Sequence, residues 1–587
     1  MSNASPMRAP APEAPAPAPV APSGAKVRAR DLPAGLKTYL ARYWVGKLDV
    51  RPFAFYRMAL GIFLFYDLCD FFPSMRTFFS DEGVLPRTPF LGQWARAWRF
   101  SLLDSFGPPA LTYVFWFFSA ACVLSMAVGY RTRLASFLSF VCLASFQERL
   151  PPLFDGSDTV IRMALFWHMF CPTGNAWSVD ALLAERRGQP LSKLVGALPF
   201  RILQLQIAFI YLCTFAHKIQ GTTWRNGDAV HYTVHLNHVF SRPWAATTIA
   251  DIAPLMKLAT WGTLVFECSF LFLVFLPSPS AKLFKWVKAL AILNIVAMHV
   301  GIMFTINVGN FSYLMPLTLT ILWEPEWIQA MVDWIVKKLG PSRMERIREL
   351  ALKFPDFRVV DAPAGGWFSP VAKERIINWG GAALVLWFIA CTWYATPPYI
   401  RTWTGAQLSV VSRALGQGNV NPMPHWIETP VQALDVWSSW DMFSPEPLRT
   451  DYHLTAPGEL EDGTQINLFG SDAGEERGFW FTRWFKYFEN VTGGDQLLPL
   501  EWGRYMCREH NFNMAPGTKR LYTFTLYKDN QIIPPIGQPW PPVTRQTVWV
   551  HRCFDKPNEN KPANPNPGPI ATTPSPGPRQ NQPALSP

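Results

Sequence analysis

The sequence predicts an all-α polytopic membrane bundle of about nine transmembrane helices, followed by a small C-terminal extramembrane α+β domain. Of the 587 residues, 49% are hydrophobic and only 16% are charged, whereas soluble domains average about 25% charged residues. Apolar segments of about 20 residues, the length with which a helix crosses a bilayer core, recur along most of the chain. Near the C-terminus they give way to short alternating runs that are typical of strands.

Nine apolar segments are expected to cross the membrane. They are residues 52–72, 109–130, 134–150, 159–172, 198–216, 255–276, 287–306, 308–323 and 376–396. The fourth and eighth are shorter than the roughly 20 residues that a spanning helix needs. Lysine and arginine are concentrated in alternate connecting segments, which the positive-inside rule places in the cytoplasm. The distribution predicts a multi-pass protein of the plasma (inner) membrane with a cytoplasmic N-terminus and an extracytoplasmic C-terminal domain.

Composition divides the chain into six regions. They are a disordered, Pro/Ala-rich cytoplasmic tail (1–45), a transmembrane domain (46–323), basic cytoplasmic interfacial helices (324–374), a last transmembrane helix (375–396), an extracytoplasmic α+β domain (397–555) and a disordered Pro/Asn-rich tail (556–587). The net charge of +11 comes from basic residues that lie between apolar segments, where they act as topology signals. The lipid bilayer is therefore the expected partner, and nucleic acid is not.

The C-terminal domain is predicted to contain helices over residues 480–488 and 502–510 and strands over 521–526 and 547–553. Its only two cysteines are Cys507 and Cys553. In an oxidising compartment they are expected to form a disulfide. The alternative is a pair of free thiols in a domain that faces the cytoplasm.

A basic pair, His217-Lys218, follows the fifth apolar segment directly. A lysine at a helix end often extends its charged group to the membrane interface, and this explanation needs no chemistry. The surrounding pattern favours a second interpretation, because Tyr211 precedes Lys218, Trp224 follows six positions later and Gly227 three positions after that.

This pattern resembles the catalytic-lysine segment of the vitamin K-dependent γ-carboxylases and their bacterial relatives, the HTTM-domain proteins. Other motifs of residues 51–323 resemble the same family in order and spacing. They are Phe79-Ser-Asp-Glu-Gly83-Val-Leu-Pro86-Arg87, Gly129-Tyr130-Arg131, Trp177-Ser178-Val179-Asp180, and His299 with Phe304, Gly309 and Phe311. The resemblance implies a helical membrane domain that acts on a quinone.

The resemblance also implies a chemistry. Lys218, with His217 beside it, would deprotonate a reduced vitamin K or menaquinone, with O2 and CO2 as co-substrates, and Trp224, Tyr211 and Asp158 would bind the quinone. A lysine suits this step because desolvation lowers the pKa of its amine. The family has a histidine linked to epoxidation where this chain reads Asp155-Gly156-Ser157-Asp158. Carboxylation is therefore left open, and the sequence does not identify a protein substrate.

Two further groups of residues have both a functional and a structural interpretation. His231, His235 and His238 would share one helical face and could bind a metal ion, but three such histidines more often belong to a solvated outer helix. Arg57, Asp67, Arg162 and Glu267 lie within apolar segments. Such charges pair between helices or line a cavity.

Three classes of function are consistent with the sequence. The first is an enzyme for quinol-dependent oxygenation (epoxidation), with or without carboxylation. The second is a non-catalytic membrane protein that binds a quinone or lipid or acts as a scaffold. The third is a transporter that uses the charges inside the apolar segments, although the inverted repeats typical of many transporters are not apparent.

Overall fold

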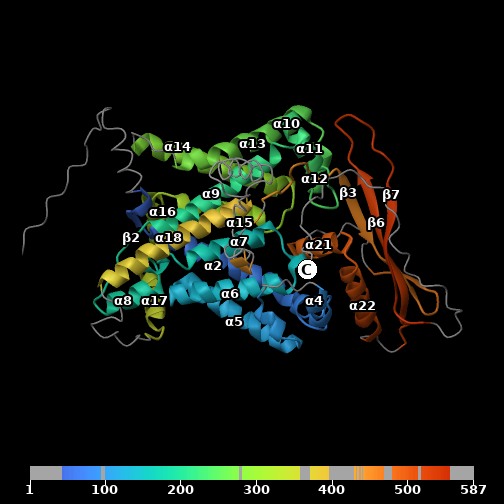
Figure 1. Cartoon of the computed structure of the whole chain (residues 1–587), viewed down its shortest axis with the longest axis horizontal. Helices are drawn as coiled ribbons and strands as arrows, with labels where there is room; N and C mark the ends of the chain where they lie inside the picture. The colour runs from blue at the N-terminus through green and yellow to red at the C-terminus, as the bar shows by residue number, and fades with distance from the viewer. Residues whose placement is uncertain are drawn as a thin grey trace, which may run out of the picture.

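The structure is a computed structural model that describes residues 43–93, 100–275, 281–356, 370–395, 440–468, 479–512 and 517–555, with a few positions between 429 and 438. The predicted tail 556–587, and all but the last three residues of the predicted tail 1–45, lie outside these ranges. The chain is mostly helical, with a small sheet near its C-terminus (Figure 1).

The helices before residue 396 form a bundle. Their bounds are α2 (Arg51–Phe71), α3 (Met75–Phe79), α4 (Arg87–Gln93), α5 (Pro109–Val128), α6 (Thr132–Arg149), α7 (Gly156–His168), α8 (Val179–Arg186), α9 (Leu198–Lys218), α10 (Thr222–Asn226), α11 (Ala229–Val234), α12 (Pro243–Thr248), α13 (Ala253–Phe275), α14 (Ala281–Thr305), α15 (Phe311–Thr318), α16 (Pro325–Leu339), α17 (Pro341–Leu352) and α18 (Pro370–Ala395). Strands β1 (Lys47–Asp49) and β2 (Leu194–Gly196) pair at one end.

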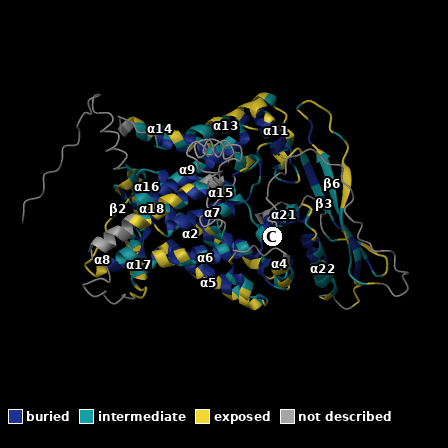
Figure 2. Ribbon diagram, in the orientation of Figure 1, coloured by how far each residue is buried: buried dark blue, intermediate teal, exposed yellow. Residues whose placement is uncertain are grey.

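Five helical segments in the described ranges are long and apolar enough to cross a membrane. They are Arg51–Phe79, Pro109–Val128, Leu198–Lys218, Ala253–Phe275 and Leu283–Thr305, and they correspond to the first, second, fifth, sixth and seventh predicted spans. Their outward faces expose large apolar side chains, among them Ile62, Val114, Leu258 and Leu293 (Figure 2). Contiguous apolar surface of this kind is rare on soluble proteins.

The prediction of nine spans is not supported. Helix α6 has 18 residues but carries Arg133, Glu148 and Arg149. Helix α7 has 13 residues, about 20 Å, and α15 has 8, both shorter than the roughly 30 Å bilayer core. In α18 the apolar part is confined to Trp379–Thr392 among the described positions. Short apolar helices covered by neighbours resemble spans in sequence, because burial and a bilayer select the same residues.

The C-terminal region contains helices α21 (Phe479–Val491) and α22 (Leu497–Phe512) and strands β3 (Thr450–Thr455), β4 (Pro457–Leu460), β5 (Gln465–Asn467), β6 (Leu521–Ile532) and β7 (Thr544–Arg552). The predicted helices and strands are present, each longer than expected or shifted by a few residues. All pairings are antiparallel, with β3 and β4 on one edge of the long central β6 and β7 on the other. The helices α21 and α22 lie between the bundle and this sheet (Figure 1).

Candidate functional site

The predicted catalytic residue, Lys218, is the last residue of α9 and points into the protein. Its Nζ donates to Oε1 of Glu267, on α13, at 2.6 Å, and the two side chains are only 8% and 4% exposed. The Nζ also lies 4.7 Å from the ring centre of Trp224. A lysine that extended to the membrane interface would be exposed, so the geometry does not fit the first interpretation of this residue.

Tyr211 lies two helical turns before Lys218 on the same face of α9. Its hydroxyl is 3.1 Å from Nε2 of His299, on α14. Both side chains are buried, as is Glu267. Within the described part of the chain, Glu267 Oε2 and His299 Nδ1 have no hydrogen-bond partner. Buried polar atoms are nearly always paired, so these two atoms are available to a ligand.

Tyr211, Lys218, Glu267 and His299 line a cavity of about 540 Å³ between the bundle and the C-terminal region, whereas Trp224 does not line it. The bundle supplies apolar walls from Ile210, Phe240, Met298, Ile302, Val308 and Phe311. The cavity is also lined by the charged residues Asp155, Asp441, Glu446, Lys486 and Glu489. The cavity is within the size range of small-molecule sites and combines apolar walls with a few polar groups, as such sites do.

The segment from Trp440 to Glu446 closes the cavity against α10. The indole Nε1 of Trp224 donates to the Phe443 carbonyl at 2.8 Å. The Glu446 carboxylate accepts from the backbone N–H groups and hydroxyls of Thr222 and Thr223. Burial alone would raise the pKa of Glu446, but these hydrogen bonds outweigh it and lower the pKa. At Gly221 an added Cβ would clash with the Pro445 carbonyl oxygen, so only glycine permits this approach.

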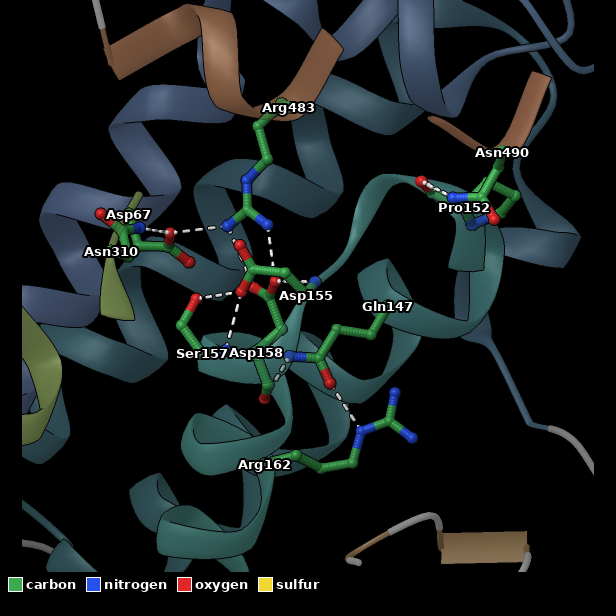
Figure 3. Close-up of polar contacts among 10 residues, drawn as sticks. All are labelled: Asp67, Gln147, Pro152, Asp155, Ser157, Asp158, Arg162, Asn310, Arg483 and Asn490. Atoms are coloured by element: carbon green, nitrogen blue, oxygen red, sulfur yellow. Dashed lines mark hydrogen bonds and ion pairs between the residues drawn. The ribbon is translucent and has the colours of Figure 1, made fainter. Parts of the chain in front are cut away.

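Asp158, which was expected to bind the quinone, contacts the C-terminal region instead. Figure 3 shows Arg483 of α21 reaching between Asp158 and Asp67. Its Nη1 donates to Asp158 Oδ2 at 2.6 Å, and its Nη2 donates to Asp67 Oδ1 at 3.1 Å. Asp158 also accepts from the backbone N–H of Asp155 at 2.8 Å and caps α7. Burial raises the pKa of Asp158 to about 7, although Arg483 acts to lower it.

The other predicted site residues are placed as follows. Asp158 does not line the cavity, whereas its neighbours Asp155 and Gly156 do, so Asp158 has a structural role where quinone binding was expected. His217 is buried beside Lys218 but is not part of the cavity wall. Cys507 and Cys553 form a disulfide with a Cα–Cα distance of 5.5 Å.

His231, His235 and His238 do not form one cluster. His238 Nδ1 is 2.6 Å from Asp451 Oδ2 of β3, while His231 and His235 lie beside Asp251. The metal set predicted from helical spacing is wrong in its third member, because α11 ends at Val234 and the chain turns before His238. Asp251 comes 16 positions after His235, and no sequence spacing indicated it.

Comparisons with known proteins place the chain in no described family. No model of a known protein family matches the sequence, and no solved structure matches it either. The chain is 23% identical over 210 residues to the uncharacterized protein YitO of Bacillus subtilis. That match covers 33% of this chain and 60% of YitO. The function therefore has to be argued from the site itself.

Proposed function

We propose that the protein is a membrane enzyme that binds a reduced isoprenoid quinone, such as menaquinol or vitamin K hydroquinone, and uses the buried Lys218–Glu267 pair to remove a proton from its hydroxyl group. The observation that carries the proposal is the unpaired Glu267 Oε2 in the wall of a largely apolar cavity. The family resemblance of the sequence provides a second, independent line of support.

The residues around the cavity fit a quinol. A quinol combines a flat apolar ring, an apolar tail and two hydroxyl groups. The walls include Phe240 and Phe311 together with aliphatic side chains, while Glu267 Oε2 and His299 Nδ1 can each bond one polar group. The Glu267 carboxylate would repel an anionic ligand group. A neutral hydroxyl group, which can donate a hydrogen bond to this carboxylate, therefore fits better.

The ion pair suggests how the proton moves. In the ion pair with Glu267, 2.6 Å away, Lys218 is an ammonium group without a lone pair, so the open basic atom of the pair is Glu267 Oε2. We infer that Glu267 accepts the hydroxyl proton and that Lys218 holds this carboxylate in place and balances its charge in the low-dielectric interior. When bound, the quinol supplies the electrons for O2, and the two together yield the quinone epoxide and water.

We also propose that the five apolar helices cross the plasma membrane with the C-terminal region on the extracytoplasmic side and the N-terminus in the cytoplasm. Helix α8 lies at the end of the bundle opposite the sheet (Figure 1). Segments 131–133 and 186–193 contain five basic residues, as cytoplasmic segments do, and the region around the sheet contains the disulfide, which an oxidising compartment maintains. In a non-reduced digest of protein from cells, Cys507 and Cys553 peptides should be linked; quantitatively alkylated thiols would contradict this orientation.

A turnover assay tests the proposed function. Protein in lipid nanodiscs is given menaquinol and O2, and chromatography measures the epoxide. Lys218→Met and Glu267→Gln should each lower the rate by about 10²- to 10⁴-fold, the usual contribution of a general base. Removing one partner of a buried pair costs about 3–5 kcal/mol of stability, so the double variant, which buries no unpaired charge, is needed to separate folding from chemistry.

Lys288 offers a matched control. It forms a buried ion pair with Glu324 at 2.9 Å, and neither residue lines the cavity. Lys288→Met should therefore resemble Lys218→Met in stability but keep the parental rate. If the folded double variant turned over quinol as fast as the parent, the proposal would fail. Tight quinol binding without epoxide formation by the parent would favour a non-catalytic quinone-binding protein.

A further inference from the structure

A cluster of two histidines and an aspartate lies on the side of the bundle that faces the sheet. His231 belongs to α11, His235 follows that helix, and Asp251 precedes α13. Asp251 Oδ1 is 3.4 Å from His235 Nε2 and 3.8 Å from His231 Nδ1. One potential ligand atom from each residue lies within 4.8 Å of those of the other two. Both imidazoles are buried, whereas the Asp251 side chain is 69% exposed.

Backbone carbonyls hold both rings. His235 Nδ1 is 3.0 Å from the His231 oxygen, and a carbonyl oxygen can only accept, so this nitrogen donates and Nε2 of the uncharged ring carries a lone pair that faces Asp251. His231 lies 3.0 Å from the Pro534 oxygen through Nε2 and 2.9 Å from the Ala250 oxygen through Nδ1. In the tautomer whose hydrogen is on Nε2, the Nδ1 lone pair also faces Asp251.

The result is a set of acceptors that face one another. In this tautomer two nitrogen lone pairs, the Asp251 carboxylate and the Ala250 carbonyl face one another. Extra protons or a cation between them would satisfy all four. Two imidazolium rings would lie 4.4 Å apart and repel each other. A cation is the better solution.

We propose that His231 Nδ1, His235 Nε2 and the Asp251 carboxylate bind one divalent transition-metal ion, with zinc the best match. Two histidines and one carboxylate, with an open fourth position, are a recurrent zinc ligand set. Ligand atoms at about 2.05 Å in a tetrahedron are about 3.3 Å apart, close to the 3.4 and 3.8 Å separations from Asp251. Hydrogen bonds from ligand histidines to backbone carbonyls are the usual support for such sites.

The site opens onto a second cavity of about 540 Å³. His231 and Asp251 form one wall, and the β6–β7 loop from Pro534 to Trp540 forms the other. A solute in this cavity could reach the open position of the ion. Because neither Lys218 nor Glu267 lines this cavity, the metal site is independent of the proposed quinol chemistry.

The test uses the full-length protein without a polyhistidine tag, in detergent, after dialysis against a chelator. Cobalt titration followed by visible absorbance, and zinc content measured by mass spectrometry, should each give one ion per chain. Loss of an outer-shell partner already lowers metal affinity by about 10- to 100-fold, so His235→Ala and Asp251→Asn should weaken binding by at least about 100-fold.

His238→Ala is the matched control, since His238 follows the same segment but pairs with Asp451; it should bind zinc as the parent does. Asp251→Asn changes an exposed side chain and should remain folded, which size-exclusion chromatography can verify. A parent protein that binds no stoichiometric cobalt or zinc ion when the metal is added back would overturn the proposal. So would unchanged affinity in Asp251→Asn, or a loss in His238→Ala equal to that in His235→Ala.

Discussion

The Glu446 carboxylate links the C-terminal region to the start of α10. It accepts from Thr222 and Thr223 N–H groups, which are unsatisfied donors at a helix N-terminus. Its pKa is lowered from an ordinary value of 4.5, so its stabilising effect is fully present above about pH 4.5 and is lost as the pH falls through the folded-state value. We expect Glu446→Ala to lower stability by about 0.5–2 kcal/mol at pH 7 and to match the parent in strong acid.

Thermal unfolding in detergent between about pH 3 and 7 measures this difference. Glu345→Ala, which removes an exposed carboxylate on α17, should change stability little at any pH. A Glu446→Ala deficit that persisted unchanged in acid would mean that packing, and not the charged hydrogen bonds, joins the two regions.

Among single residues, contacts within one segment of the chain were easier to predict than contacts between distant segments. Lys218 and Trp224 do meet, and Tyr211 lines the same cavity as Lys218, because one helix and its following turn present these three residues. Glu267 was noted as a charge in an apolar segment, but its pairing with Lys218 joins positions 49 apart. No periodic pattern encodes such a contact, and the same is true of Asp251 beside His231.

At the level of elements, α21 is attached to the bundle by Arg483. The guanidinium donates to Asp158 and Asp67 (Figure 3). It also lies over the rings of Phe71 and Phe154. Asn310 donates to the same Asp67 oxygen at 2.5 Å. Arg483→Met would leave two carboxylates buried with no counter-charge from this position, so we expect a loss of about 3–5 kcal/mol.

Chemical or thermal unfolding of the purified protein measures this loss. Arg520→Met is the matched control, because Arg520 pairs with Glu461 and the two side chains are 53% and 31% exposed, and surface pairs contribute at most about 1 kcal/mol. Equal effects of the two substitutions would show that the Arg483 contacts do not hold α21 in place.

Elements with a clear hydrophobic pattern were predictable, including the five long apolar helices and strands β6 and β7 of the C-terminal sheet, whereas β3, β4 and β5 were not predicted. Helices α7 and α15 were mistaken for spans because neighbouring helices bury them almost as completely as lipid would. The sequence predicted α21 only as a helix. No local pattern shows that its Arg483 binds Asp158 and Asp67, which lie 325 and 416 positions away.

At the scale of the whole molecule, the cavity belongs to neither region alone. The bundle provides Lys218, Glu267 and many of the apolar lining residues. The C-terminal region provides the charged residues Asp441, Glu446 and Lys486. Sequence reasoning treated these regions as separate domains, one inside the membrane and one outside it. Their joint wall follows from long-range packing, which composition cannot reveal.

Photolabelling tests the central claim, that this cavity takes a quinol beside the Lys218–Glu267 pair. An azido-menaquinone is irradiated with the protein in nanodiscs, and the labelled peptides are identified by mass spectrometry. We expect label on α9 near Tyr211, on α14 near Met298 and on the segment from Trp440 to Glu446, with unmodified menaquinone competing. Label confined to the outward, lipid-facing helix surfaces, or label that excess menaquinone does not reduce, would contradict the account.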